Sequence, residues 1–321
     1  MPSGSVDRLT GAARRPRRRG ASRFAPEPPT ELPPGRLVHV GGRGEFFVRD
    51  TGRGSPTVLL LHGWTASADL NWFAQYATLA EAGYRVLALD HRGHGRGLRS
   101  ADPFRLSLCA EDAAAVVREL GVDPVLAVGY SMGGPITQLL ARDHGDLVGG
   151  IVLCATSREW RNPRMTLLWR GMGLLRLILG LFPNAAWRAG LRALGLPDDR
   201  TTSWVASELS RGSARDIAEA GRELGRFDSR PWIGALGVPA AVIVTTRDTG
   251  VPPSKQRALA QALGGPVVEV AGDHMAVSTR AAEFNRALLG ALSAVGTGEA
   301  SGNGHRPDAA PLTDAGPAPE R

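Results

Sequence analysis

The chain has 321 residues, of which 43% are hydrophobic, so it is long enough to bury a substantial core in one α/β domain with extensions. Its formal net charge is +7, and seven arginines lie within residues 1–25, so the excess does not indicate a specific nucleic-acid-binding domain. Two cysteines, Cys109 and Cys154, exclude a disulfide scaffold. No metal or nucleotide motif occurs, so no cofactor is expected.

The first segment in chain order lacks apolar periodicity. Residues 1–35 are rich in Arg and Pro, and we expect them to be disordered. No apolar run follows the arginines, so the segment does not have the pattern of a secretory signal. We therefore expect a cytoplasmic protein, and weak contact of the basic tail with a membrane surface stays an open alternative.

Alternating strand and helix patterns then predict the core, over residues 36–157 and 231–295. A hairpin is expected at 36–40 and 45–49, followed by strands near 57–61, 84–89, 125–130, 149–155, 240–246 and 266–270. Helical patterns lie near 70–82, 107–120, 135–144, 253–263 and 280–292. This order predicts an α/β fold with a mostly parallel eight-stranded sheet and helices on both faces.

The alternation stops over residues 158–230, where helical patterns predict a cap inserted after the sixth strand. Residues 165–182 are long and apolar, but Arg170 and Arg176 would each cost about 2.5–3.5 kcal/mol near a bilayer centre. A helix packed on the core is therefore favoured. An interfacial helix, with one apolar side on lipid or substrate, stays open. Residues 296–321 are rich in Gly, Ala and Pro and are expected to be disordered.

A candidate nucleophile lies where a predicted strand turns abruptly into a helix. The turn is Gly129-Tyr130-Ser131-Met132-Gly133, a G-x-S-x-G pattern. With 41 glycines in the chain the bare pattern is weak, and its place between strand and helix is what supports it. We expect Ser131 to hold a strained backbone, Gly129 and Gly133 to avoid clashes, and the Met132 N–H to face the reacting group.

A second loop can complete an oxyanion hole. The apolar strand near 57–61 ends in His62-Gly63-Trp64. Gly63 allows close approach of the backbone, and the Trp64 N–H is the expected second donor, worth roughly 3–4 kcal/mol in a transition state. Since His62 lies on this loop, a general-base role for it is disfavoured.

The candidate acid and base follow further along the chain. Asp248 comes just after the strand at 240–246, and such a position lies at the edge where parallel sheets place their sites. A turn-capping role for Asp248 is the alternative, and Asp90, Glu159 and Asp273 are competing carboxylates. His274 lies in a glycine-containing loop, whereas His305, the other histidine after Asp248, lies in the tail.

Together these segments resemble the α/β-hydrolase fold superfamily, in its serine esterase/lipase branch, over residues 36–292. Asp90-His91-Arg92-Gly93-His94-Gly95 is similar to a D-x-R-G-x-G segment common in that family, which is expected to shape a loop without acting in catalysis. Dehalogenase-like and epoxide-hydrolase-like members have an Asp nucleophile, so Ser131 argues against both.

The resemblance implies a Ser131–His274–Asp248 triad that hydrolyses an ester through an acyl-enzyme. The apolar cap favours a lipophilic small-molecule ester. Thioesterase, lactonase, perhydrolase/haloperoxidase-like and carbon–carbon bond hydrolase activities on the same triad stay open. A binding scaffold without catalysis is disfavoured, because all three triad candidates are present.

Overall fold

The structure is a computed structural model that describes residues 24–161 and 169–296. The expectations for residues 1–23 and 297–321, and for the start of the apolar run at 162–168, lie outside these described residues.

One eight-stranded sheet forms the centre of the molecule, in the order β1-β2-β4-β3-β5-β6-β7-β8. β1 and β2 form an antiparallel hairpin, β2 pairs antiparallel with β4, and the other neighbours are parallel. The strands are β1 (Gly35–Val40), β2 (Gly44–Asp50), β3 (Thr57–Leu61), β4 (Arg85–Leu89), β5 (Val125–Tyr130), β6 (Val148–Cys154), β7 (Ala240–Thr245) and β8 (Val267–Val270).

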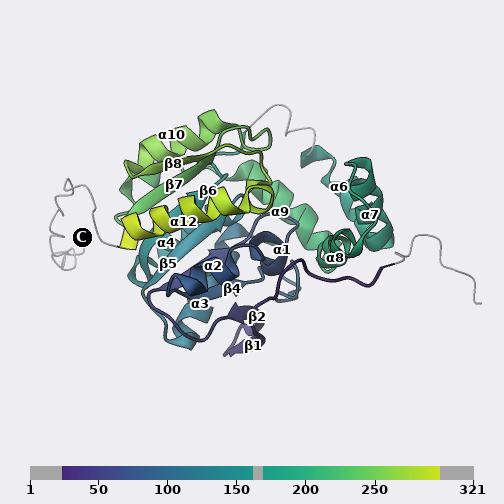
Figure 1. Cartoon of the computed structure of the whole chain (residues 1–321), viewed down its shortest axis with the longest axis horizontal. Helices are drawn as coiled ribbons and strands as arrows, with labels where there is room; N and C mark the ends of the chain where they lie inside the picture. Colours follow the sequence, from purple (N-terminus) through teal and green to yellow (C-terminus); the bar gives the residue numbers. More distant parts are fainter. Residues whose placement is uncertain (1–23, 162–168, 297–321) are drawn as a thin grey trace, which may run out of the picture.

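Helices cover both faces of this sheet (Figure 1). Leu59 and Leu61 of β3 join a core with α3 (Leu106–Leu120), α4 (Gly133–Asp143) and α10 (Pro253–Leu263). Val58 and Leu60 point to the other face, into a core with four other helices. These are α1 (Ala68–Trp72), α2 (Tyr76–Glu81), α11 (Ala276–Thr279) and α12 (Ala281–Gly296). Side chains of a strand alternate in direction, so one apolar strand supplies both cores.

The helix expected over 70–82 is two short helices, α1 and α2. The Ser67 side chain caps α1 by accepting the Leu70 N–H at 3.1 Å. Between the helices, the buried Gln75 side chain donates to the Val277 carbonyl and to Asn285, each at 2.9 Å. This anchor on α11 and α12 is a tertiary contact that helical periodicity does not report.

Residues 24–34 are the described part of the segment that the sequence analysis expects to be disordered. They form neither helix nor strand, as their prolines predict, but they have partners on the folded chain. The Thr30 hydroxyl donates to the Phe73 carbonyl at 3.1 Å, and Arg49 donates to the Pro33 carbonyl at 2.8 Å.

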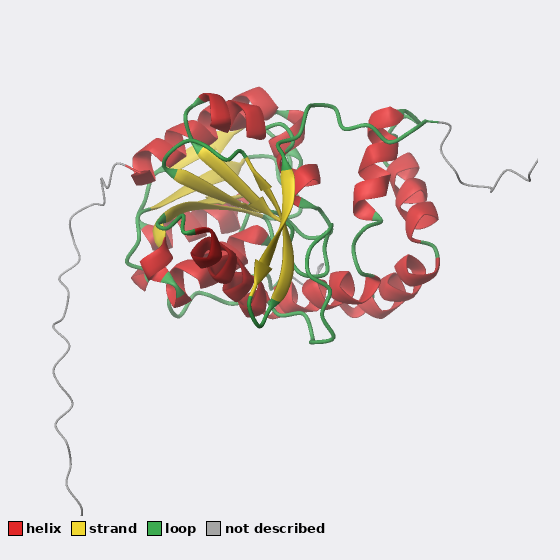
Figure 2. Cartoon of the chain, turned by 90° about the horizontal axis from the view of Figure 1, so that it is seen from below, coloured by secondary structure: helices red, strands yellow, loops and turns green. Residues whose placement is uncertain are grey.

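The cap lies between β6 and β7, to one side of the sheet (Figures 1 and 2). It consists of α6 (Met172–Leu181), α7 (Pro183–Ala193), α8 (Arg200–Leu209) and α9 (Ala214–Arg226). A β-bridge between Glu159 and Asp228 joins its two ends at the base, beside a Ser229 N–H to Arg158 carbonyl bond of 2.8 Å. Within the described residues, no helix combines the length and apolar character needed to cross a bilayer.

Candidate active site

Ser131 lies on the sharp turn between β5 and α4, with a backbone φ of +52°. Its backbone is held on both sides, because its N–H donates to the Cys154 carbonyl at 3.0 Å and its carbonyl accepts the Thr156 hydroxyl at 2.8 Å. A side chain at Gly133 would collide with the Leu61 carbonyl, and one at Gly129 with the Gly133 carbonyl. The strained turn therefore requires small residues at both flanks.

Ser131, His274 and Asp248 form a continuous hydrogen-bonded chain. His274 Nε2 lies 3.0 Å from Ser131 Oγ, and His274 Nδ1 lies 2.7 Å from Asp248 Oδ2. The three residues come from the ends of β5, β7 and β8, so the carboxyl edge of the sheet brings together side chains far apart in the sequence. A nucleophile, a base and an orienting carboxylate in this geometry can activate a serine hydroxyl.

Asp248 is buried and held by its own loop. Its Oδ1 accepts the N–H groups of Gly250 at 2.8 Å and Val251 at 2.9 Å, and its Oδ2 accepts the Thr245 hydroxyl at 2.9 Å. The carboxylate thus caps its own loop and also faces His274. The His274 loop has a support of its own, since the Tyr130 hydroxyl donates to the His274 carbonyl at 2.9 Å.

The competing carboxylates have other partners. Glu159 pairs with Lys255 at 2.7 Å, and Asp273 accepts the Met275 N–H at 2.8 Å. Asp90 is fully buried and accepts the N–H groups of Ala68 at 2.6 Å and Arg96 at 2.7 Å. Burial raises the pKa of Asp90 to about 6, against the lowering effect of these two donors.

The loop after β3 lies against Ser131. A Cβ on Gly63 would lie 3.3 Å from the Ser131 Cβ, and the Gly63 N–H is fixed by the Asn71 side chain at 2.9 Å. Within the described residues, neither the Trp64 N–H nor the Met132 N–H donates to a protein group. Two backbone donors beside a nucleophile are the elements from which an oxyanion hole is built.

His62 is packed behind this loop, away from a general-base role. Its Nδ1 lies 2.8 Å from the Gly63 carbonyl, and its Nε2 accepts the His91 N–H at 3.0 Å. The ring packs at a tilt against those of His91 and His94, at centroid distances of 4.2 and 5.6 Å. Burial holds the pKa of His62 well below its usual value, with His91 and His94 adding to this, so the ring is neutral and structural.

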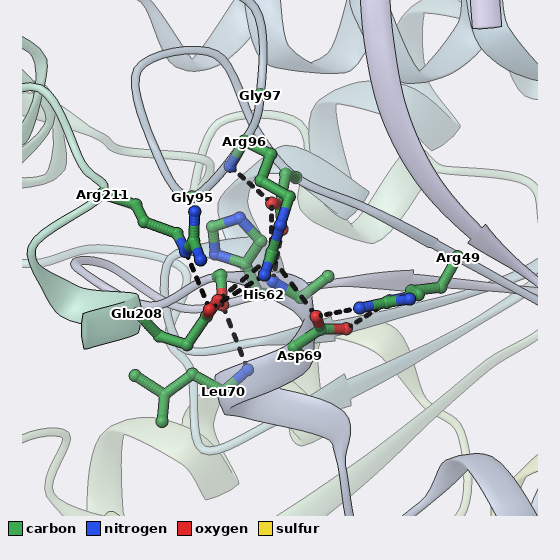
Figure 3. A network of polar contacts seen from close by, with 12 residues as sticks. Arg49, His62, Asp69, Leu70, Gly95, Arg96, Gly97, Glu208 and Arg211 are labelled. Atoms are coloured by element: carbon green, nitrogen blue, oxygen red, sulfur yellow. Dashed lines mark hydrogen bonds and ion pairs between the residues drawn. The ribbon is translucent and has the colours of Figure 1, made fainter. Parts of the chain in front are cut away.

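A buried charge network connects the loop to the cap (Figure 3). Glu208 of α8 accepts the Ser67 hydroxyl at 2.8 Å and two hydrogen bonds from Arg96, at 2.9 and 3.1 Å. Arg49 of β2 makes a bidentate pair with Asp69 of α1, at 2.7 and 2.8 Å. Ser67 and Asp69 directly follow the Gly63–Trp64 loop, so the network braces the loop from the cap side.

Trp64 carries a second link to the cap. Its indole N–H donates to the Ile217 carbonyl of α9 at 2.8 Å, and its ring packs edge-on against Trp169 at 5.7 Å. Gly221 and Gly225, one turn apart on α9, leave room for these rings, because a Cβ on either would press on an indole. An aromatic wall therefore extends from the cap to the residue beside Ser131.

The sequence analysis does not predict the residues that brace the site, which include Ser67, Asn71, Tyr130 and Glu208. Tyr130 was visible inside the G-x-S-x-G turn, but its role depends on a carbonyl 144 residues away. Ser67 had the pattern of a helix cap, and only the fold brings it to Glu208. Within the described residues no group of three or more His, Cys, Asp or Glu side chains could hold a metal ion.

Comparison with known proteins agrees with this architecture. A family model described as alpha/beta hydrolase fold matches residues 56–281. A non-heme haloperoxidase of Rhodococcus erythropolis is 41% identical over 110 residues, which are 34% of this chain and 39% of the relative. A bifunctional esterase/perhydrolase of Acinetobacter calcoaceticus is 40% identical over 111 residues, 34% of this chain and 40% of the relative. The chain spans about two fifths of the length of these curated relatives.

Solved structures show the same fold at lower identity. A bromoperoxidase from Bacillus anthracis superposes with a TM-score of 0.69 and 23% identity, over 81% of this chain and all of the other. A hydrolase from Pseudomonas aeruginosa gives a TM-score of 0.70 at 22% identity, over 81% and 98%. With the sheet order, the cap position and the matched family model, the chain belongs to the alpha/beta hydrolase fold family.

Proposed function

We propose that this protein is a serine hydrolase that cleaves carboxylic esters through an acyl-enzyme on Ser131. The single observation that carries the proposal is the hydrogen-bonded chain from Asp248 through His274 to Ser131 Oγ, at 2.7 and 3.0 Å. The free N–H groups of Trp64 and Met132 support it, because they can hold the oxyanion that such chemistry creates.

In the proposed reaction, His274 Nε2 takes the hydroxyl proton while Ser131 Oγ attacks the ester carbonyl carbon. Asp248 accepts a hydrogen bond from His274 Nδ1, which fixes the tautomer and stabilises the imidazolium. The tetrahedral intermediate collapses, and its alcohol leaves with the proton from His274. Water, activated by the same histidine, then attacks the acyl-enzyme and releases the acid with Ser131 restored.

The surroundings favour a lipophilic small-molecule ester. Trp64 and Trp169 form an apolar wall next to the reacting groups, and the buried Met172 of α6 packs against the same face of α9. Such a wall binds an acyl or alkyl chain by excluding water from it. No specific nucleic-acid partner and no cofactor are part of the proposal.

The experiment is hydrolysis of p-nitrophenyl esters from acetate to palmitate, with the wild type beside Ser131→Ala. We expect the substitution to lower kcat by on the order of 10⁶-fold. A fluorophosphonate probe should label the wild type and not the variant. Circular dichroism of both proteins controls for folding. Full turnover by a folded Ser131→Ala protein would contradict the proposal.

Perhydrolysis is the second candidate, and the two relatives described above favour it, since one is a haloperoxidase and the other a bifunctional esterase/perhydrolase. Hydrogen peroxide would replace water in the second half of the cycle, so that its oxygen attacks the acyl carbon and a peracid leaves. The test is peracid formation from p-nitrophenyl acetate and peroxide, with Ser131→Ala as control. Hydrolysis without any serine-dependent peracid would exclude this candidate.

A further inference from the structure

Helix α6 is apolar on both of its sides, although only one side is covered. Met172 and Leu179 are 1% and 5% exposed and lie on the packed side, which meets α9. Leu174, Leu177 and Ile178 belong to the other side, together with Leu181. These four side chains are 42–63% exposed and recur at the i, i+3, i+4, i+7 spacing that places them in one row.

This exposed row continues beyond the helix. Phe182, directly after α6, is 64% exposed. We call Leu174, Leu177, Ile178, Leu181 and Phe182 the α6 strip. α6 lies in the part of the cap that extends away from the sheet (Figures 1 and 2). Contiguous exposed apolar surface of this kind marks an interaction site.

The charges around the strip have one sign. Residues 169–193 contain four arginines and no carboxylate. Arg188 pairs with Asp198 at 2.9 Å, whereas Arg170, Arg176 and Arg192 are exposed and make no ion pair within the described residues. Arg170 precedes Leu174 by four residues, so it lies in line with the strip. An apolar row with an unpaired arginine in line with it matches a surface that offers negative charge above an apolar interior.

We propose that the α6 strip docks the cap on an anionic lipid surface. The five apolar side chains would enter the region between headgroups and acyl chains, and the arginines would contact the lipid phosphates. The ten residues of α6 span about 15 Å at 1.5 Å per residue, which is too short to cross a hydrocarbon core of about 30 Å, so the proposal places the helix in the plane of the surface. A second copy of the chain fits the strip less well, because two arginine-bordered strips would repel each other.

The proposal goes beyond ester hydrolysis and does not depend on it, so its test is binding and not turnover. The full-length Ser131→Ala protein is sedimented with vesicles of mixed phosphatidylglycerol and phosphatidylcholine, and separately with vesicles of phosphatidylcholine alone. The test variant combines Leu177→Asp with Leu181→Asp. The matched control is Leu37→Asp on β1, since Leu37 is 59% exposed and Leu177 is 57% exposed.

We expect binding to the anionic vesicles, at least ten-fold weaker binding to phosphatidylcholine, and at least ten-fold loss in the double variant. The control should bind like the parent, and Arg170→Glu should weaken binding several-fold. The arginines of residues 1–25 are present in every protein, so binding that the double variant retains would assign the contact to that tail and overturn the proposal.

Three further results would also overturn it: no binding by the folded parent, equal binding to both kinds of vesicle, or a concentration-dependent dimer that the double variant abolishes in place of vesicle binding. Sedimentation velocity detects the dimer. Loss of ester hydrolysis in Ser131→Ala with vesicle binding intact keeps the two proposals separate.

Discussion

At the scale of single residues, the Asp248 carboxylate has partners both inside and outside its own loop. Two backbone N–H groups and the Thr245 hydroxyl fix the carboxylate, and His274 Nδ1 lies against the oxygen that faces the site. Asp273 is the nearest carboxylate in sequence to the same histidine, yet it is exposed and accepts the Met275 N–H of its own loop. The two aspartates therefore allow a matched comparison.

We predict that Asp248→Asn lowers kcat by on the order of 10⁴-fold, because the amide no longer holds the imidazole in the tautomer that accepts the serine proton. Asp273→Asn should retain nearly full activity, since asparagine can still accept the Met275 N–H. Steady-state kinetics on a p-nitrophenyl ester measure both. Equal losses in the two variants would contradict the assignment of the carboxylate role to Asp248.

At the scale of elements, α8 of the cap braces the start of α1 through a buried glutamate. Glu208 is 2% exposed and contacts both Ser67 and Arg96, and Ser67 caps the helix that follows the Gly63–Trp64 loop. A second cap-to-core pair, Glu223 of α9 with Arg105 at 3.0 Å, is at the surface and touches neither loop nor α1. Because the Glu208 pair is buried and the Glu223 pair is not, we expect breaking the Glu208 pair to cost more stability.

We predict that Glu208→Gln lowers the free energy of unfolding by about 1–3 kcal/mol, because Arg96 and Ser67 lose a charged acceptor. It should also lower kcat about ten-fold with a smaller change in KM, since the Trp64 N–H would be held less firmly beside Ser131. Glu223→Gln should cost less than about 1 kcal/mol and leave kcat unchanged. Urea unfolding and ester kinetics distinguish them, and an unaltered kcat in Glu208→Gln would contradict the brace.

The contrast between these elements also explains what the sequence could predict. The G-x-S-x-G turn, the apolar strands and Asp248 just past β7 are local patterns, so their positions in the fold follow from the residues around them. Glu208 looks like a solvated charge on an ordinary helix, and its partner Ser67 is 141 residues away. Contacts between the cap and the core depend on how the helices pack, and periodicity does not specify that packing.

At the scale of the whole molecule, the three buried histidines His62, His91 and His94 make the free energy of unfolding depend on pH. Burial lowers the pKa of His91 to about 3 and that of His94 to about 4, and it lowers that of His62 as well. Between pH 6.5 and pH 4 the unfolded chain therefore binds more protons than the folded one, and the free energy of unfolding falls as the pH falls. Asp90, with its pKa raised to about 6, binds a proton in the folded state and offsets one of the three histidines below pH 6.

We predict that these groups together remove about 4 kcal/mol of stability between pH 7 and pH 5, at about 1.4 kcal/mol per proton and pH unit. Urea unfolding at both pH values measures the change. His91→Leu should reduce this pH dependence, because it removes one of the three titrating rings. Leucine breaks no hydrogen bond of the ring, since the ring nitrogens of His91 have no partner in the described part of the chain. His39→Gln, at an exposed histidine, should not. A pH dependence that His91→Leu leaves unchanged would contradict this origin.

The closed base of the cap has a consequence for how this fold can diversify. The bridge between Glu159 and Asp228 and the Ser229 contacts join the two ends of the cap before its helices begin. The cap is therefore a loop whose two ends are fixed on the core, while β7 and β8 fix the positions of Asp248 and His274. α6 and α7 can therefore be exchanged for a segment of different length or composition while Asp248 and His274 keep their positions. α8 and α9 must stay, because Glu208 and Ile217 hold the loop that carries Trp64. Substrate preference and surface attachment can then evolve while the reacting groups stay in place.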